Sequence, residues 1–463
     1  MFLRSLRVTK YAAGILLVGL ATLVSCKKED PKSNLAGLTA FSIKDLNVPF
    51  TIDETQRIIQ NADSLPFQTD VSAYVANFTA VPLSTVKVGG VAQVSGTTVN
   101  DFSEPLQYDV VAEDGVTTRS YTVRVNVAQI DPNGLAWQRI TSNADYASFH
   151  DLKATYFNNK FYALGANSNS TNGSYSSVDG TAWTTLTAKD NNDLPIPSYE
   201  HGSLITFKNK MWLLGGLLPD IGFNFGKGLN DIWSSSDGVT WQLSQAGTSD
   251  RWAGRERASS VVFKDKLWIF GGSGYPNFSN TDNTGNTVFK DIWNSTDGTT
   301  WTKIGELPGD YINRADVAMF VYKDKLWVAG GWTKPSAAAG NFFNDIWNSA
   351  DGVTWTKVNT QTVFTPRGGF QVIVHNDQLL AVGGETVDGI VSEIWSSEDD
   401  GVNWHKVEAG DSRALPNDFP AKAFYNLVKQ DENTFWILGG LGPKDMGTGK
   451  YAIAKDIWKV KLN

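Results

Sequence analysis

The stretch Leu267-Trp268-Ile269-Phe270-Gly271-Gly272 decides the fold, because versions of it recur along the chain. Each copy is a short apolar run that ends in two glycines, which is typical of a buried β-strand leading into a turn. With one degenerate copy included, the first glycine of the pair recurs at six positions: Gly165, Gly215, Gly271, Gly330, Gly383 and Gly439. A spacing of roughly 50 to 60 residues indicates a repeat architecture rather than separate domains.

A second repeated unit follows each Gly-Gly strand and predicts two further strands. In residues 231–241 it begins with Asp-Ile-Trp and runs through an Asp-Gly turn to a second Trp. Copies occupy residues 291–301, 345–355 and 393–404, and a degenerate copy occupies residues 173–183. Asp-Gly is a strong hairpin signal, because glycine adopts the positive φ that tight turns need. Each repeat therefore predicts a Gly-Gly strand followed by a hairpin of two further strands.

The two ends of the repeat region complement each other. The sixth copy stops after the Trp at residue 458 and lacks an outer strand, whereas residues 135–140 precede the first copy and have the pattern of that missing strand. Pairing residues 135–140 beside residues 456–461 would close a ring and leave no exposed sheet edge. The sequence thus predicts an all-β chain in which residues 130–463 form a six-bladed β-propeller closed by an N-terminal strand.

These repeats resemble the kelch family of β-propellers, which is also seen in galactose oxidase-like propeller domains. The resemblance covers about 330 residues, from Trp137 to the C-terminus. It implies a rigid scaffold that hosts many different functions, so the fold alone does not identify the activity.

The distribution of tryptophan agrees with this architecture. All 17 Trp residues lie between Trp137 and Trp458, and 15 of them occupy repeated strand positions, where we expect them to pack between blades. Only Trp252 and Trp332 lie outside these columns, in segments that vary between repeats. Exposed rings in such loops could stack on sugars, and the alternative is that each ring pins down its own loop.

Residues 36–129 precede the propeller and contain short runs in which apolar and polar residues alternate, as in residues 71–75 and 121–125. This pattern predicts a β-sandwich. A predicted closing hairpin turns at Asp114-Gly115 and resembles those of Ig-like or cadherin-like domains in surface lipoproteins of Bacteroidetes. We expect this domain to act as a spacer or in docking.

Residues 1–25 read as an export signal with Arg4, Arg7 and Lys10 before an apolar run. The run ends in Leu-Val-Ser-Cys at residues 23–26, which resembles the lipobox of bacterial lipoproteins. The resemblance implies that Cys26, the one cysteine of the chain, is lipidated and that residues 26–35 form a tether. We therefore expect membrane attachment through Cys26 at the bacterial outer membrane. The charged residues 27–30 resemble the surface-export signal of Bacteroidetes lipoproteins, which implies that the protein faces outward.

The face that carries the variable loops is where we look for a site. Arg255, Arg314 and Arg367 stand just before the innermost strands, at equal distances from the Gly-Gly pair. Converging at the channel mouth, they could bind a carboxylate or sugar hydroxyls, but arginines at this position of kelch repeats also serve structure. Glu200 and His201 form the one acid and imidazole pair near this rim and are a weak acid/base candidate. Two residues beyond the arginine column stand a further five residues: Asp151, His201, Arg257, Asp316 and Gly369.

Composition excludes several other functions. The net charge of −8 disfavours nucleic acid as a partner. The four His residues show no metal-ligand spacing, and residues 282–286 lack the later Glu of a complete calcium loop. Galactose oxidase chemistry needs a Cys-Tyr cross-link, for which no cysteine is available in the propeller. We expect no metal and no cofactor.

Two functions remain open at this stage. The first is a non-catalytic lipoprotein whose propeller binds a glycan or a cell-surface protein. The alternative is a carbohydrate-active enzyme, either a sugar epimerase or mutarotase, or a sialidase-like enzyme as residues 397–404 suggest by their Asp-box pattern. The sequence shows no catalytic motif that would decide between them.

Overall fold

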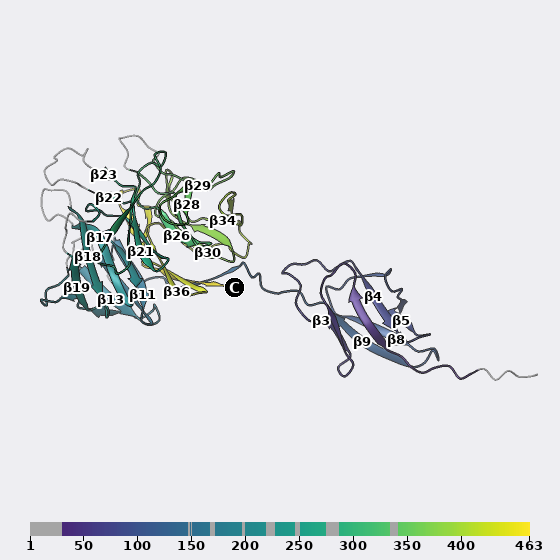
Figure 1. Ribbon diagram of the computed structural model, residues 1–463. Coiled ribbons are helices and arrows are strands. Elements are labelled where there is room, and N and C mark those ends of the chain that lie inside the picture. The colour runs from purple at the N-terminus through teal and green to yellow at the C-terminus, as the bar shows by residue number, and fades with distance from the viewer. Residues whose placement is uncertain are drawn as a thin grey trace, which may run out of the picture. The chain divides into compact units, whose positions relative to one another are not determined.

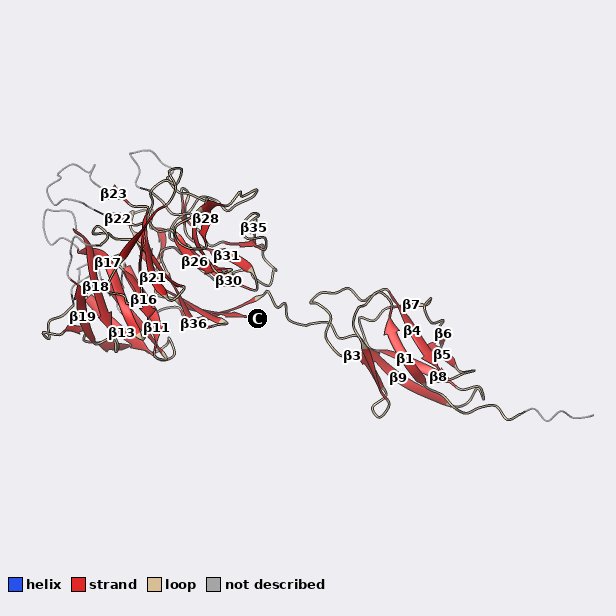
Figure 2. Ribbon diagram, viewed as in Figure 1, coloured by secondary structure: helices blue, strands red, loops and turns tan. Residues whose placement is uncertain are grey.

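The computed structural model describes residues 30–146, 149, 151–166, 172–196, 200–218, 227–245, 251–274, 287–333 and 341–463. Every regular element in these ranges is a β-strand, which confirms the predicted all-β class (Figure 2). No helix that is long and apolar enough to cross a membrane occurs in these ranges. The chain divides into two compact units, Met1–Gln129 and Ile130–Asn463. Cys26 and the expected export signal lie outside the described residues.

The N-terminal unit is built from two sheets that share one core. One sheet has the order β1-β4-β7 and the other the order β2-β3-β9-β8-β5-β6. The core contains Phe41 from β1 together with Tyr108 and Tyr121 from the second sheet, so the sheets pack face to face as a sandwich. The predicted hairpin at Asp114-Gly115 joins β8 and β9. The strands of this unit are β1 (Leu38–Ile43), β2 (Phe50–Asp53), β3 (Ile58–Asn61), β4 (Tyr74–Ala80), β5 (Thr85–Val88), β6 (Val91–Ala92), β7 (Val99–Asn100), β8 (Leu106–Val111) and β9 (Thr118–Arg124).

The C-terminal unit contains the six predicted blades, each a sheet of four antiparallel strands (Figure 1). Blades 1 to 3 consist of β11 (Asp151–Phe157), β12 (Lys160–Ala166), β13 (Asn172–Ser177) and β14 (Thr184–Leu186); β16 (Ser203–Phe207), β17 (Lys210–Leu218), β18 (Lys227–Ser235) and β19 (Thr240–Gln245); and β20 (Ser259–Phe263), β21 (Lys266–Phe270), β24 (Asp291–Ser295) and β25 (Thr302–Glu306). A short strand, β15 (Lys189–Asp190), adds to blade 2 in parallel with β19.

Blades 4 to 6 follow the same plan. They consist of β26 (Ala318–Tyr322), β27 (Lys325–Ala329), β28 (Ile346–Ser349) and β29 (Thr356–Lys357); β30 (Gln371–His375), β31 (Gln378–Val382), β34 (Ile394–Ser397) and β35 (His405–Lys406); and β36 (Asn426–Asp431), β37 (Thr434–Leu438), β40 (Ile457–Leu462) and β10 (Leu135–Thr141). Small hairpins extend the loops of blades 3, 5 and 6, namely β22 (Ser273–Gly274) with β23 (Thr287–Val288), β32 (Glu385–Thr386) with β33 (Gly389–Ile390), and β38 (Leu441–Lys444) with β39 (Tyr451–Ile453).

The predicted closing strand is confirmed. Strand β10 pairs antiparallel with β40, and the register places Gln138 opposite Lys459. The first and last parts of the propeller therefore share blade 6. This pairing gives β40 a partner on both sides and hides what would otherwise be a sheet edge.

Tryptophan rings of one blade pack against the Asp-Gly turns of the next blade, which explains why these turns require glycine. Gly298 in blade 3 has a φ of 82°, and a Cβ atom built on it would lie 2.4 Å from the Trp212 ring of blade 2. Gly352 in blade 4 meets the Trp268 ring of blade 3 in the same way, at 2.3 Å. Any larger residue would collide with the ring as well as strain the backbone. The turns thus fix the spacing between blades.

Candidate functional site

Arg255, the first of the three arginines expected at the channel mouth, is buried inside its own blade. It is 1% exposed, and its guanidinium forms a bidentate pair with Asp291 through contacts of 2.6 and 2.9 Å. The same side chain donates a hydrogen bond of 2.9 Å to the carbonyl of Gly271. Arg255 therefore ties the approach to the innermost strand to the Gly-Gly turn and the third strand.

Arg314 and Arg367 repeat this arrangement. Arg314 pairs with Asp345, and the Nη2 atom of Arg367 lies 2.9 Å from Oε2 of Glu393. They are 1% and 0% exposed. The expected convergence of the three arginines on a ligand does not occur, because each guanidinium is held by the third-strand acid of its own blade. The structural alternative describes them correctly.

The sixth member of this column is Lys422, which the sequence did not reveal. Its Nζ atom lies 2.8 Å from Oδ1 of Asp456, and the side chain is fully buried. Blade 6 has a longer turn between its first two strands, with a register shift between Lys429 and Asp431. Counting back from Gly439 by the usual interval therefore reaches the wrong residue.

The residues two positions beyond this column form the mouth of the central channel. They are Asp151, His201, Arg257, Asp316, Gly369 and Phe424, one from each blade, and we call them the channel-mouth residues. The last five have φ values between 50° and 63°. This left-handed conformation is uncommon for residues other than glycine, and here it recurs at the same position of successive blades.

Backbone hydrogen bonds join the channel-mouth residues from blade to blade. The N–H of Arg257 donates to the carbonyl of His201 at 2.8 Å, and the N–H of Phe424 donates to that of Gly369 at 2.7 Å. The amides of Asp316 and Gly369 make the equivalent bonds of 3.3 and 3.0 Å. At blade 2 the carboxylate of Asp151 accepts from the N–H of His201 instead, at 2.5 Å. The mouth is thus a continuous chain of bonds that holds its side chains in fixed positions.

The channel has a volume of about 610 Å³ and is lined by the innermost strands of all six blades. Consecutive innermost strands touch one another from β11 to β30, and β36 returns to β11. Hydroxyl groups line part of the interior, where Ser203 and Ser260 lie 2.6 Å apart and Thr155 and Thr206 lie 3.0 Å apart. The channel is therefore polar in its interior as well as at its mouth.

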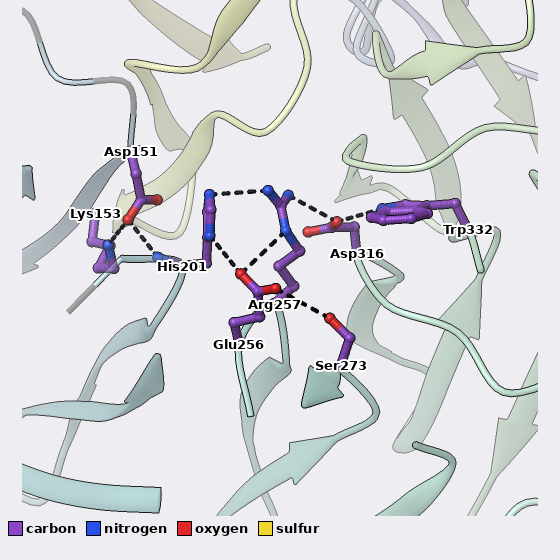
Figure 3. Close-up of polar contacts among 8 residues, drawn as sticks. All are labelled: Asp151, Lys153, His201, Glu256, Arg257, Ser273, Asp316 and Trp332. Carbon is purple, nitrogen blue, oxygen red and sulfur yellow. Dashed lines mark hydrogen bonds and ion pairs between the residues drawn. The ribbon is translucent and has the colours of Figure 1, made fainter. Parts of the chain in front are cut away.

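The ring of His201 is held between two side chains of blade 3 (Figure 3). Its Nδ1 atom lies 2.7 Å from Oε2 of Glu256, and its Nε2 atom lies 3.0 Å from Nη2 of Arg257. Arginine only donates hydrogen bonds, so Nε2 accepts and Nδ1 carries the proton. The carboxylate that orients this ring is Glu256, whereas sequence order had pointed to Glu200.

Arg257 connects this histidine to blade 4. Its Nη1 atom lies 3.2 Å from Oδ2 of Asp316, and the same oxygen accepts a hydrogen bond of 2.5 Å from Nε1 of Trp332 (Figure 3). Burial alone would lower the pKa of Arg257, but the charges of Asp316, Glu256 and Asp151 outweigh this effect and raise it. Arg257 therefore stays charged at the mouth.

Asp151 forms the other end of the cluster and pairs with Lys153 of the same strand. Burial alone would raise the pKa of Asp151, but the charge of Lys153 and the hydrogen bonds from Lys153 and from the N–H of His201 lower the pKa to about 2. The carboxylate is consequently charged at any physiological pH. Its side chain is 12% exposed, which leaves one edge open to the channel.

The two tryptophans outside the sequence columns have different surroundings. Trp252 is 0% exposed and packs edge-on against Trp301 with ring centroids 4.6 Å apart. The idea of an exposed stacking ring is therefore wrong for Trp252, which anchors its own loop. Trp332 is half-buried, and the guanidinium of Arg257 lies 6.0 Å from its ring centre.

A second tier of residues surrounds the mouth, one step outward. Backbone bridges join Leu217 to Glu200, Ser273 to Glu256, Trp332 to Ala315, Glu385 to Gly368, and Leu441 to Ala423. Each of the first-named residues directly follows a Gly-Gly pair, so Trp332 occupies a repeated position whose residue type varies. The backbone bridge between Glu200 and Leu217 places Glu200 beside the mouth.

Glu385 is the acidic member of this second tier. Its Oε1 atom accepts a hydrogen bond from the hydroxyl of Tyr451, which comes from the β38–β39 hairpin of blade 6. Burial and the neighbouring carboxylate raise the pKa of Tyr451, so the phenol stays protonated. Spacing in the sequence gave no sign of this pair, because the two residues are 66 positions apart.

Among the described residues, no group of three or more His, Cys, Asp or Glu side chains is arranged to hold a metal ion. The channel-mouth cluster instead combines carboxylates with arginine, lysine and imidazole. This arrangement can donate hydrogen bonds to a polar ligand and accept hydrogen bonds from it.

Comparisons with known proteins agree with the architecture. The KLHDC2/KLHL20/DRC7 Kelch-repeats domain matches residues 150–384, the DUF6242 N-terminal domain matches residues 23–125, and the DUF6242 beta propeller domain matches residues 324–463. The solved structure of YjhT is similar with a TM-score of 0.50 and 16% identity, over 68% of this chain and 95% of that one. At this identity the likeness shows the fold alone.

Proposed function

The chain belongs to the Kelch-repeat family of β-propellers, and from this premise we propose that its propeller binds a saccharide at the channel mouth without transforming it. The observation that carries the proposal is the cluster of His201, Arg257 and Asp316, which combines donors and acceptors at the opening of a polar channel. Sugar hydroxyls both donate and accept hydrogen bonds, so such a cluster suits them.

The size of the channel and the rigidity of its mouth support a binding role. A volume of about 610 Å³ is within the range of small-molecule sites. The chain of backbone bonds between blades holds the side chains in place before a ligand arrives, which lowers the entropy cost of binding. The half-buried ring of Trp332 provides an apolar surface beside the charged groups.

Anchoring at the bacterial outer membrane through Cys26 is a further part of the proposal. It is supported by the lipobox-like residues 23–26, and the β-sandwich would then hold the propeller away from the lipid. Metabolic labelling with an alkyne fatty acid tests this directly. We expect labelled protein in the membrane fraction, and we expect Cys26→Ser to lose both the label and the membrane association. An unlabelled wild-type protein would refute the anchor without affecting the binding site.

The binding proposal is tested with a glycan array, followed by calorimetry on each glycan that binds. We expect Arg257→Ala to reduce affinity about tenfold or more, because it removes charge-assisted hydrogen bonds at the mouth. Arg139→Ala is the matched control, since this arginine is 44% exposed and pairs with Asp418 away from the channel. Equal losses in both variants would contradict a site at the mouth, and binding of a protein partner alone would replace the saccharide.

A second candidate function is a sugar epimerase or mutarotase, and the His201–Glu256 pair favours it. A carboxylate that orients an imidazole at 2.7 Å is an arrangement used in proton transfer. Incubation of the protein with bound sugars, followed by NMR, distinguishes the two functions. Turnover that disappears in Glu256→Gln while binding persists would establish the enzyme and overturn the non-catalytic proposal.

A further inference from the structure

The charges at the mouth and its second tier are unbalanced. Among the described residues there, the carboxylates of Asp151, Glu256, Asp316 and Glu385 lie near the cations Lys153 and Arg257, and Lys444 lies over the ring of Tyr451, the partner of Glu385. A ligand that enters the channel from this face therefore meets a surplus of negative charge.

The oxygen atoms that remain open to a ligand also favour a ligand that donates hydrogen bonds. In Asp151 and Asp316 every hydrogen bond and ion pair uses Oδ2, so Oδ1 has no partner among the described residues. The two side chains are 12% and 14% exposed. Both line the channel, on opposite sides of the His201 and Arg257 pair. Ionised carboxylate oxygens only accept hydrogen bonds.

Glu385 repeats this pattern in the second tier. Its Oε1 atom accepts from Tyr451, and its Oε2 atom has no partner within the part of the chain that the structure describes. The backbone of Glu385 pairs with Gly368, which adjoins Gly369 of the mouth. The two open acceptors that line the channel thus come from blades 1 and 4, and Glu385 adds a third beside the mouth, from blade 5.

We propose that the mouth selects saccharides that present hydroxyl and ammonium donors and discriminates against saccharides that carry a carboxylate. This inference rests on the proposed function and names the ligand class for the same site. An ammonium group both donates to the open oxygens and offsets the surplus charge, so amino sugars bind most tightly. A neutral sugar supplies the donors alone. The carboxylate of an acid sugar is a further negatively charged acceptor. It would face protein carboxylates whose open oxygens need donors.

The test uses sugars that differ in one group. D-Glucose, D-glucosamine and D-glucuronate form one series, and D-galactose, D-galactosamine and D-galacturonate form the other, with array glycans of the same three classes. At about pH 6.5 the amines are largely protonated. We expect affinity to fall in the order amino, neutral, acidic within a series, with about tenfold or more between the first and last members. Added salt should weaken amino sugar binding most.

Variants assign the preference to the named oxygens. Glu385→Gln should narrow the gap between amino and neutral sugars about threefold or more, because the amide removes one charge and can still accept from Tyr451. Glu432→Gln is the control, since Glu432 is 91% exposed at the turn between β36 and β37 and pairs with Lys429. It should leave the order of affinities unchanged.

Two negative results are distinguishable. Acidic sugars that bind as tightly as amino sugars would overturn the inference and leave the saccharide site standing. Failure of every sugar and array glycan to bind would overturn the proposed function itself. An unchanged preference in Glu385→Gln would remove Glu385 from the selecting groups, and the same result in Asp316→Asn would overturn the charge argument.

Discussion

The Nη2 atom of Arg257 lies 3.0 Å from Nε2 of His201, across the boundary between blades 3 and 2. Because Glu256 contacts the other ring nitrogen at 2.7 Å, one donor and one acceptor from the same blade grip the imidazole. The ring therefore has a single hydrogen-bonding pattern, with the proton on Nδ1. This contact connects the two halves of the channel-mouth cluster.

The first prediction concerns this tautomer. Nitrogen-15 NMR of the folded protein near neutral pH should show His201 with a protonated Nδ1 and an unprotonated Nε2. In Arg257→Ala the donor to Nε2 is lost, so the ring should populate the other tautomer or the charged form. His405 lies on an exposed outer strand and reports the behaviour of an unconstrained ring. A wild-type His201 that carries its proton on Nε2 would show that the assigned hydrogen bonds are wrong.

The second prediction separates stability from binding in the buried arginines. Arg367→Ala removes the buried partner of Glu393, which keeps its more exposed partner Lys406, and should lower the free energy of unfolding by about 3 kcal/mol. Arg139→Ala, at an exposed ion pair, should cost only about 0–1 kcal/mol. Urea denaturation measures both. Saccharide affinity of the folded Arg367→Ala protein should remain near that of wild type, and a selective loss of affinity would restore this arginine to the binding site.

The third prediction concerns acid stability. Burial alone would raise the pKa of Glu393, but hydrogen bonds from Lys406, Arg367 and Trp395 lower it to about 2. A carboxyl whose folded pKa lies below its unfolded value binds its proton more weakly in the folded state. Its stabilising effect is therefore complete above about pH 4.5 and declines as the pH falls toward 2.

Melting temperatures measured from neutral pH to about pH 2 test this dependence. Wild-type protein should lose stability progressively below about pH 4.5, with Asp151 contributing in the same window because its pKa is also about 2. Glu393→Gln should be less stable at neutral pH and should have a shallower acid decline. Glu432→Gln, at an exposed site, should follow the wild-type curve. A parallel curve for Glu393→Gln would contradict the assigned pKa.

The sequence predicted the six blades because their determinants are local and repeated. The Gly-Gly and Asp-Gly elements need glycine for backbone reasons, so each copy marks its position whatever the surrounding loops contain. The closing strand was predictable for a related reason. The sixth repeat lacks an outer strand, and residues 135–140 before the first repeat have the pattern of that strand.

The site was only partly predictable, because the direction of a side chain depends on φ. The repeats placed Arg255 and Arg257 two positions apart, and both were plausible at the mouth. In the structure Arg257 has a left-handed backbone and lines the channel. Arg255 does not have this conformation, and its side chain is buried within the blade. Phe424 was missed because the longer turn in blade 6 shifted the count by one residue. The Glu385–Tyr451 pair depends on hairpins that no repeat describes.

The fourth prediction tests the closing strand. Gln138 and Lys459 are directly opposite in the β10–β40 pairing, so Gln138→Cys with Lys459→Cys should form a disulfide under mild oxidation. Gln138→Cys with Lys461→Cys is the matched control, because Lys461 pairs with Ala136 instead. Peptide mapping of the oxidised proteins should find the cross-link in the first variant and far less in the second. Equal cross-linking would show that the register is not fixed.

The fifth prediction concerns the chain of backbone bonds at the mouth. Gly369 has a φ of 63°, and a Cβ atom built on it would lie 2.5 Å from the Phe424 ring. Its amide and carbonyl also link Asp316 to Phe424. Gly369→Ala should therefore cost about 2–4 kcal/mol of unfolding free energy, combining backbone strain with displacement of the ring.

Gly305→Ala provides the comparison, because Gly305 lies in outer strand β25 with no heavy atom within 4 Å of the added Cβ. It should change stability by no more than about 0.5–1 kcal/mol. Gly369→Ala should also weaken saccharide binding, since a displaced Phe424 breaks the chain of bonds that positions Asp316 and Arg257. If Gly369→Ala unfolded like wild type and bound normally, the chain of left-handed residues would have no part in organising the mouth.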